Sequence, residues 1–126
     1  MSIYLAIALG GSLGAMSRYW VSTTSTAWLG SGFPFGTMIV NVTGSFAMGF
    51  LVILLTEKFV MPEAIRLALI VGFLGSYTTF STFALDSMQS LNSGALMKVT
   101  AYILISVFGS ILGLWLGNQT ARLLMR

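Results

Sequence analysis

Long apolar stretches, separated by short polar or glycine-rich runs, are the main pattern along this chain. A membrane-spanning helix needs roughly 20 predominantly apolar residues, and four stretches reach that length. They run from about Ile3 into the low twenties or on to Leu29, from about Thr37 to Leu55, from about Ala64 to Leu91, and from about Met97 to Leu116 or beyond. The connections between them are short, so the pattern predicts an all-α integral membrane protein whose four transmembrane helices form one domain over residues 1–126.

Polar residues recur at every fourth position in two of these stretches, which places each set on one face of a helix. The second stretch carries Thr37, Asn41 and Ser45, and the fourth carries Tyr102, Ser106 and Ser110. One interpretation is helix packing, because Ser and Thr bond to their own helix or to a neighbour. The other is that the two rows line a water-accessible track, since an amide such as that of Asn41 is costly in hydrocarbon without a partner. The apolar Leu112 indicates that such a track ends at Ser110.

Small residues form further rows at the same helical spacing. The fourth stretch carries a doubled GxxxG pattern at Gly109, Gly113 and Gly117. Such rows favour close packing of membrane helices. In the first stretch, Gly10 and Gly14 lead to Arg18. Arg18 either extends to a membrane interface or lines an aqueous vestibule, and the sequence leaves both interpretations open.

The segment GFLGSYTTFSTF, residues 72–83, is unlike a membrane helix interior because it combines two glycines with five Ser or Thr hydroxyls. Glycine costs about 1 kcal/mol against alanine in a helix, and hydroxyls compete for backbone hydrogen bonds. We therefore expect the third helix to break between Gly75 and Thr79. The freed carbonyls would either bind a cation or be satisfied by neighbouring helices at a kink. Phe80 and Phe83 share a face after the break, where they pack or turn their positive ring edges toward an anion.

Composition supports the membrane assignment and excludes several classes of function. The 126 residues are 56% hydrophobic and 7% charged, without cysteine or histidine, so no nucleophile–base pair or thiolate metal site can be assembled. The net charge of +3 is spread out, which argues against nucleic acid as a partner. Glu57, Glu63 and Asp86 lie in connections or toward a helix end, away from mid-span positions where proton-coupled carriers place such groups. A passive pathway, and not an enzyme, fits this set.

Basic residues are slightly more frequent on one side of the predicted membrane domain. The side with both termini carries Lys58, Arg66, Arg122 and Arg126, and the other side carries Lys98 and Arg18. The positive-inside rule then places the termini in the cytoplasm.

Three ordered motifs resemble the Fluc-type fluoride channels, also called CrcB proteins. They are GGSLGAMSRY from Gly10 to Tyr19, GTMIVNVTGSFAMG from Gly36 to Gly49, and GFLGSYTTFSTF from Gly72 to Phe83. The resemblance covers the whole chain. It implies a passive channel of the bacterial inner membrane that exports toxic fluoride and excludes chloride. It further implies an antiparallel, dual-topology homodimer in membrane lipid, with two pores and a structural sodium ion at the dimer centre.

The resemblance also implies roles for individual residues. Backbone carbonyls of Gly75 and Thr78 would bind the sodium ion, Asn41 would donate a hydrogen bond to fluoride, and Arg18 would lie in the vestibule. The remaining residues of the fluoride pathway would be aromatic or hydroxyl-bearing: Phe80, Phe83, Thr37, Ser81, Thr82, Tyr102, Ser106 and Ser110. Family members often carry a second glycine after Gly75, where this chain has Ser76, which makes the break less permissive.

Two other functions remain open at this stage. The chain has the size and layout of a small dual-topology transporter of organic cations or metabolites, although the mid-membrane carboxylate of such carriers is missing. A structural subunit of a larger membrane complex would show no ion flux when reconstituted alone.

Overall fold

The computed structural model describes residues 2–126, and these residues contain helices and no strand. They form four long helical segments, two of which are continuous helices and two of which include π-helical turns, written η. In order, the elements are α1 (Ile3–Leu29), α2 (Phe35–Ile53), η1 (Leu54–Lys58), α3 (Glu63–Leu67), η2 (Ala68–Leu74), α4 (Gly75–Tyr77), α5 (Phe80–Asn92) and α6 (Leu96–Leu124). The four predicted stretches are therefore helical, although the third is interrupted and α6 continues well beyond Leu116.

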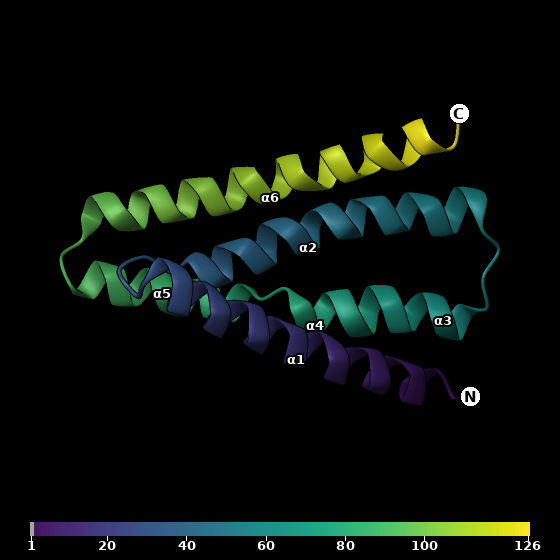
Figure 1. Ribbon diagram of the computed structural model, residues 1–126, viewed down its shortest axis with the longest axis horizontal. Helices are drawn as coiled ribbons and strands as arrows, with labels where there is room; N and C mark the ends of the chain where they lie inside the picture. The colour runs from purple at the N-terminus through teal and green to yellow at the C-terminus, as the bar shows by residue number, and fades with distance from the viewer. Residues whose placement is uncertain (1) are drawn as a thin grey trace.

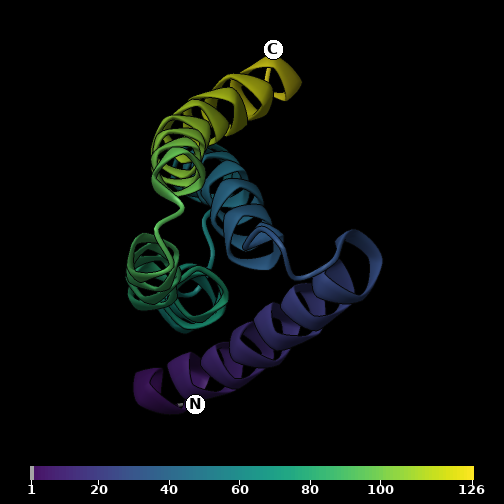
Figure 2. The same ribbon diagram turned by 90° about the vertical axis from the view of Figure 1, so that its left-hand side faces the viewer.

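The segments form an elongated antiparallel arrangement in which both termini lie at the same end (Figure 1). The connection from η1 to α3 lies at that end too, and the connections from α1 to α2 and from α5 to α6 lie at the other (Figure 1). Helix α6 packs against α2 and α5, whereas α1 packs against α2 and the first half of the third segment. Seen end-on, α1 leans away from the other helices (Figure 2).

Three of the four segments are long and apolar enough to cross a membrane: Phe35–Lys58, Glu63–Asn92 and Leu96–Leu124. Helix α1 has 27 residues, which at 1.5 Å per residue gives about 40 Å. Its length is thus sufficient, but glycine, Ser, Thr and Arg18 dilute its apolar character. The chain is an all-α membrane protein, and a membrane span for α1 stays a prediction.

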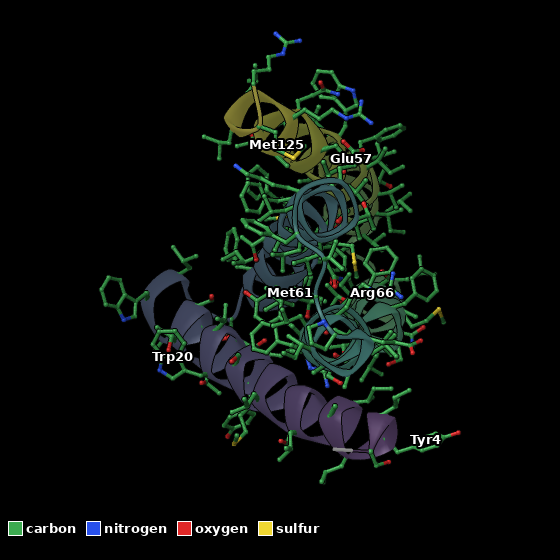
Figure 3. All side chains as sticks on the ribbon, turned by 90° about the vertical axis from the view of Figure 1, so that its right-hand side faces the viewer. Tyr4, Trp20, Glu57, Met61, Arg66 and Met125 are labelled. Carbon is green, nitrogen blue, oxygen red and sulfur yellow. The ribbon has the colours of Figure 1, made fainter. Side chains whose placement is uncertain are left out.

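Most large apolar side chains lie on the outside of the molecule. Tyr102, Leu74 and Val40 are the largest fully buried side chains, while Trp20 is 67% exposed. Figure 3 shows Trp20 and Tyr4 pointing away from the helices. Hydrocarbon is as apolar as a protein core, so such a surface is stable in a bilayer, where helices associate through close packing.

Glycines bring α2 and α6 into backbone contact. A Cβ atom at Gly49 would overlap the carbonyl of Leu114, and one at Gly117 would overlap the backbone of Phe46. At Gly113, a Cβ would lie 3.0 Å from the carbonyl oxygen of Val42. The packing interpretation of this glycine row is therefore confirmed.

Candidate functional site

The third helical segment is interrupted at Thr78 and Thr79, within the predicted interval. Thr78 has φ −82° and ψ 159°, and Thr79 has φ −154° and ψ 125°. Gly75 itself remains helical, with φ −63° and ψ −28°. The extended residues are thus the two β-branched threonines, whose side chains favour this conformation. Glycine lies next to the break without forming it.

Thr79 ends the break by capping α5. Its Oγ1 accepts a hydrogen bond from the backbone N–H of Thr82 at 3.2 Å and donates to Thr82 Oγ1 at 3.1 Å. Ser81 Oγ lies 3.4 Å from the same Thr79 oxygen. This arrangement satisfies an N–H of the first turn of α5, which has no partner inside the helix. The two hydroxyls predicted to support the pathway, those of Ser81 and Thr82, therefore lie around this cap.

Asn41 of α2 binds both backbone groups of Thr79. Its Nδ2 donates to the Thr79 carbonyl oxygen at 2.9 Å, and its Oδ1 accepts from the Thr79 N–H at 2.8 Å. Backbone groups freed inside a membrane must find protein or water partners, and one amide side chain supplies both here. The second Nδ2 hydrogen stays available for another acceptor.

Carbonyls before the break have different surroundings. Because the Thr79 N–H donates to Asn41, the Gly75 carbonyl loses the donor that a continuous helix would give it. Gly75 is exposed. The Thr78 carbonyl accepts a hydrogen bond at 3.4 Å from Arg18 Nη1, which reaches across from α1. Arg18, predicted in a vestibule, is half-buried against the break.

A cavity of about 260 Å³ lies beside the break. Residues of α2, the break, α5 and α6 line it. They include two members of each predicted polar row and both phenylalanines: Asn41, Ser45, Phe80, Phe83, Ser106 and Ser110. Thr37 and Tyr102 lie outside the lining. These parts of the two rows therefore line one space, which the spacing within each helix could not establish. Ser106 is 4% exposed, and its hydroxyl has no hydrogen-bond partner among residues 2–126.

Aromatic rings continue from this cavity toward the end of the molecule opposite the termini. The ring centroids of Phe80 and Phe83 lie 5.6 Å apart, and those of Phe83 and Tyr102 lie 5.2 Å apart. Phe80 is 79% exposed, so most of its ring is not covered by other residues of the chain on that side of the cavity. The pair has room to turn ring edges, which carry partial positive charge, toward the space between them.

A carboxylate links α2, α5 and α6 just beyond these rings. Asp86 Oδ2 accepts hydrogen bonds from Thr37 Oγ1 at 2.7 Å and from the Tyr102 hydroxyl at 3.0 Å. Thr37 is buried and Tyr102 is fully buried. Sequence spacing placed Thr37 and Tyr102 on separate polar faces and gave no sign that one carboxylate joins them.

Comparisons with known proteins agree with the motifs. The model of the family described as CrcB-like protein, Camphor Resistance (CrcB), matches residues 5–118. A fluoride-specific ion channel from Vibrio parahaemolyticus is 46% identical over 99% of this chain and 96% of its own length, and one from Magnetococcus marinus is 44% identical over 89% and 94%. A fluoride-specific ion channel from Methylococcus capsulatus is 46% identical over 93% of this chain, which spans about half (51%) of that relative. This chain therefore belongs to the CrcB-like family.

Proposed function

We propose that this protein is a fluoride-specific passive ion channel of the bacterial inner membrane, which lowers fluoride toxicity by export. The names of the relatives support the ion, and the three apolar helices support a multi-pass membrane location. The observation that carries the proposal is the cavity beside the break, which brings a neutral amide, serine hydroxyl groups and phenylalanine rings together.

The lining of this cavity suits a small anion that must bind there and then dissociate for conduction. Asn41 keeps one amide hydrogen for an anion, and the Ser106 hydroxyl is buried without a partner in the part of the chain that the structure describes. Neutral donors replace part of the hydration shell of an anion without holding it as a full positive charge would, and conduction requires this balance. Ser110 and the ring edges of Phe80 and Phe83 extend the lining. These residues form the proposed fluoride pathway, together with Thr37 and Tyr102 and with Ser81 and Thr82 at the cap.

A second copy of the chain completes the site in this proposal. Phe80 leaves most of its ring uncovered at the open side of the cavity, although it belongs to the most distinctive motif of the chain. An antiparallel homodimer in the lipid bilayer would cover such rings in two symmetry-related cavities and so form two pores. All four helical segments span the membrane in this arrangement, and residues 1–126 act as one channel domain.

A structural sodium ion at the dimer centre is part of the proposal. Gly75 is exposed and its carbonyl lacks the donor that a continuous helix would give it, which fits a hard cation, since unwound backbone carbonyls bind sodium in membrane proteins. The Thr78 carbonyl is a less favourable sodium ligand, because it already accepts a hydrogen bond from the Arg18 guanidinium at 3.4 Å. Two carbonyls fill only part of a cation's shell, so the partner chain would supply the others. When bound, the ion would hold the two broken helices together.

Anion efflux from liposomes tests the proposed function directly. Vesicles that contain the purified protein are loaded with potassium fluoride or potassium chloride, and valinomycin carries the compensating potassium. We expect rapid fluoride loss and no chloride loss. Folded dimers that release neither ion would contradict the proposal.

A matched pair of variants tests the cavity as the pathway. We expect Phe80→Ile to abolish fluoride efflux, while Phe108→Ile retains it. Phe108 is also largely exposed, at 65%, but lies outside the cavity lining. Equal efflux from both variants, with dimers intact, would remove Phe80 from the pathway.

A further inference from the structure

A second cavity, of about 270 Å³, lies at the end of the molecule opposite the termini. Residues near the α1–α2 and α5–α6 connections line it, among them Phe33, Ser90, Ser93 and Lys98. Figure 1 shows that both connections lie at this end. We refer to this space as the outer cavity and to the one beside the break as the central cavity.

Only one layer of side chains separates the two cavities. Phe33, which lines the outer cavity, makes an edge-on contact with Tyr102, with ring centroids 5.7 Å apart and planes at 89°. Tyr102 also contacts Phe83, which lines the central cavity. Asp86 lines the outer cavity and accepts the Tyr102 hydrogen bond. Tyr102 and the carboxylate of Asp86 therefore lie between the linings of the two cavities.

Two opposite charges occupy the outer cavity. Asp86 and Lys98 both line it, and no ion pair within 4.0 Å joins them in residues 2–126. Instead, Asp86 Oδ2 accepts hydrogen bonds from two hydroxyl groups. The negative carboxylate alone would repel an anion from the passage. The half-buried Lys98, in the first turn of α6, supplies a positive charge that offsets it, and the helix dipole has the same sign there.

We propose that the outer cavity is an entrance site for small monovalent anions, in which Lys98 attracts the ion and Phe33 extends the line of aromatic rings to the mouth. The proposal rests on the proposed channel function, whose pathway it lengthens. A charged group in a narrow, water-filled mouth raises the local concentration of the opposite ion and acts most strongly at low ionic strength. Lys98 is thus a residue that sets the rate of anion entry without contact with the central cavity.

A single cysteine gives a test in which only charge changes. The chain has no cysteine, so Lys98→Cys carries one thiol per chain. Methanethiosulfonate reagents then attach a positive, a neutral or a negative group to it. Lys58→Cys, at the opposite end of the molecule and outside both cavities, is the matched control. Fluoride efflux is measured at low, non-saturating fluoride in dilute buffer and again in 1 M potassium isethionate.

We expect the positive adduct at position 98 to conduct about threefold faster than the neutral one, and the neutral one about threefold faster than the negative one. One unit charge about 7 Å from an ion in water changes its energy by about RT, which gives this factor. The differences should shrink in 1 M salt, where the Debye length is about 3 Å. The same adducts at position 58 should conduct alike.

Equal efflux from the three adducts at position 98, or a thiol there that does not react from water, would overturn the entrance site. If Lys98→Cys does not fold, Lys98→Arg and Lys98→Gln give the same comparison, with Lys98→Arg expected to match the unmodified protein. Efflux from the unmodified protein separates a failure of the proposed function from a failure of the entrance site. Its failure to conduct fluoride would overturn the proposed function and the entrance with it, whereas conduction that is indifferent to charge at position 98 would overturn the entrance alone.

Discussion

The pairing of Asn41 with Thr79 allows the strongest quantitative prediction. Asn41→Ala removes the partners of both backbone groups of Thr79, at 2.8 and 2.9 Å, in the middle of a membrane helix. Each buried backbone group left without a partner costs about 1–3 kcal/mol. The variant should therefore lose about 2–6 kcal/mol of unfolding free energy, with the upper part of this range reached where water from the cavity does not replace the amide.

Asn41→Asp separates the two hydrogen bonds. A carboxylate still accepts from the Thr79 N–H, but it cannot donate to the Thr79 carbonyl, and it directs negative charge at that oxygen. We expect this variant to be destabilised and to stop fluoride efflux, because the charge also faces the proposed anion pathway.

Chemical unfolding in mixed micelles measures these losses, with fluoride efflux from liposomes followed in parallel. Ser45→Ala is the matched control, since Ser45 lines the same cavity one turn later on α2 and is not a partner of the break. If Asn41→Ala and Ser45→Ala unfold at the same denaturant concentration, then water satisfies Thr79 equally well and the proposed structural role of Asn41 is wrong.

Three further predictions concern the packing, the cap and the carboxylate. Gly117→Ala should cost about 1–3 kcal/mol or prevent folding, because its Cβ meets backbone, whereas Gly109→Ala meets only a side-chain methyl at 3.3 Å and should fold; equal yields of folded protein would contradict this. Thr79→Val should cost about 1 kcal/mol by removing the cap of α5, and Thr79→Ser should retain the stability, as chemical unfolding would show. Tyr102→Phe removes one of two donors to the Asp86 carboxylate and should cost about 1–3 kcal/mol; unchanged stability in the same assay would mean that water replaces the phenol.

Helix positions were predictable from the sequence because the lengths of the apolar stretches, and the short connections with glycine, proline or charged residues between them, determine them directly. The break was predictable for a similar reason, since its hydroxyl-rich motif disfavours a continuous helix. The conformation inside the break was not: Gly75 stays helical, and the two threonines become extended. A glycine permits many backbone conformations and requires none of them, whereas the cap formed by Thr79 stabilises one.

Contacts between segments that are distant in sequence could not be predicted from the sequence pattern. Helical periodicity places Asn41 and Thr37 on one face of α2, but it does not say that Asn41 pairs with a residue 38 positions away or that Thr37 binds Asp86. Such pairs depend on how helices rotate against one another. Here Gly44 of α2 lies against Thr78 and Tyr77, where a Cβ atom would overlap the Thr78 side chain, and only the assembled structure shows this close approach.

The chemistry of the break explains why an amide suits position 41 better than any other side chain. Thr79 presents one donor and one acceptor to α2, so its partner must offer one of each. A serine or threonine hydroxyl is too short to span both groups, and an aspartate lacks the donor and adds a charge. Asparagine meets both requirements and remains neutral, with a hydrogen left over for the cavity. The same property serves a passive anion path, in which a bound ion must be stabilised by a donor that carries no full charge. In the proposed channel, the stability of the break and the contact with the ion would therefore depend on one side chain, and a loss of flux in Asn41 variants counts as loss of an ion contact only where the unfolding free energy is preserved.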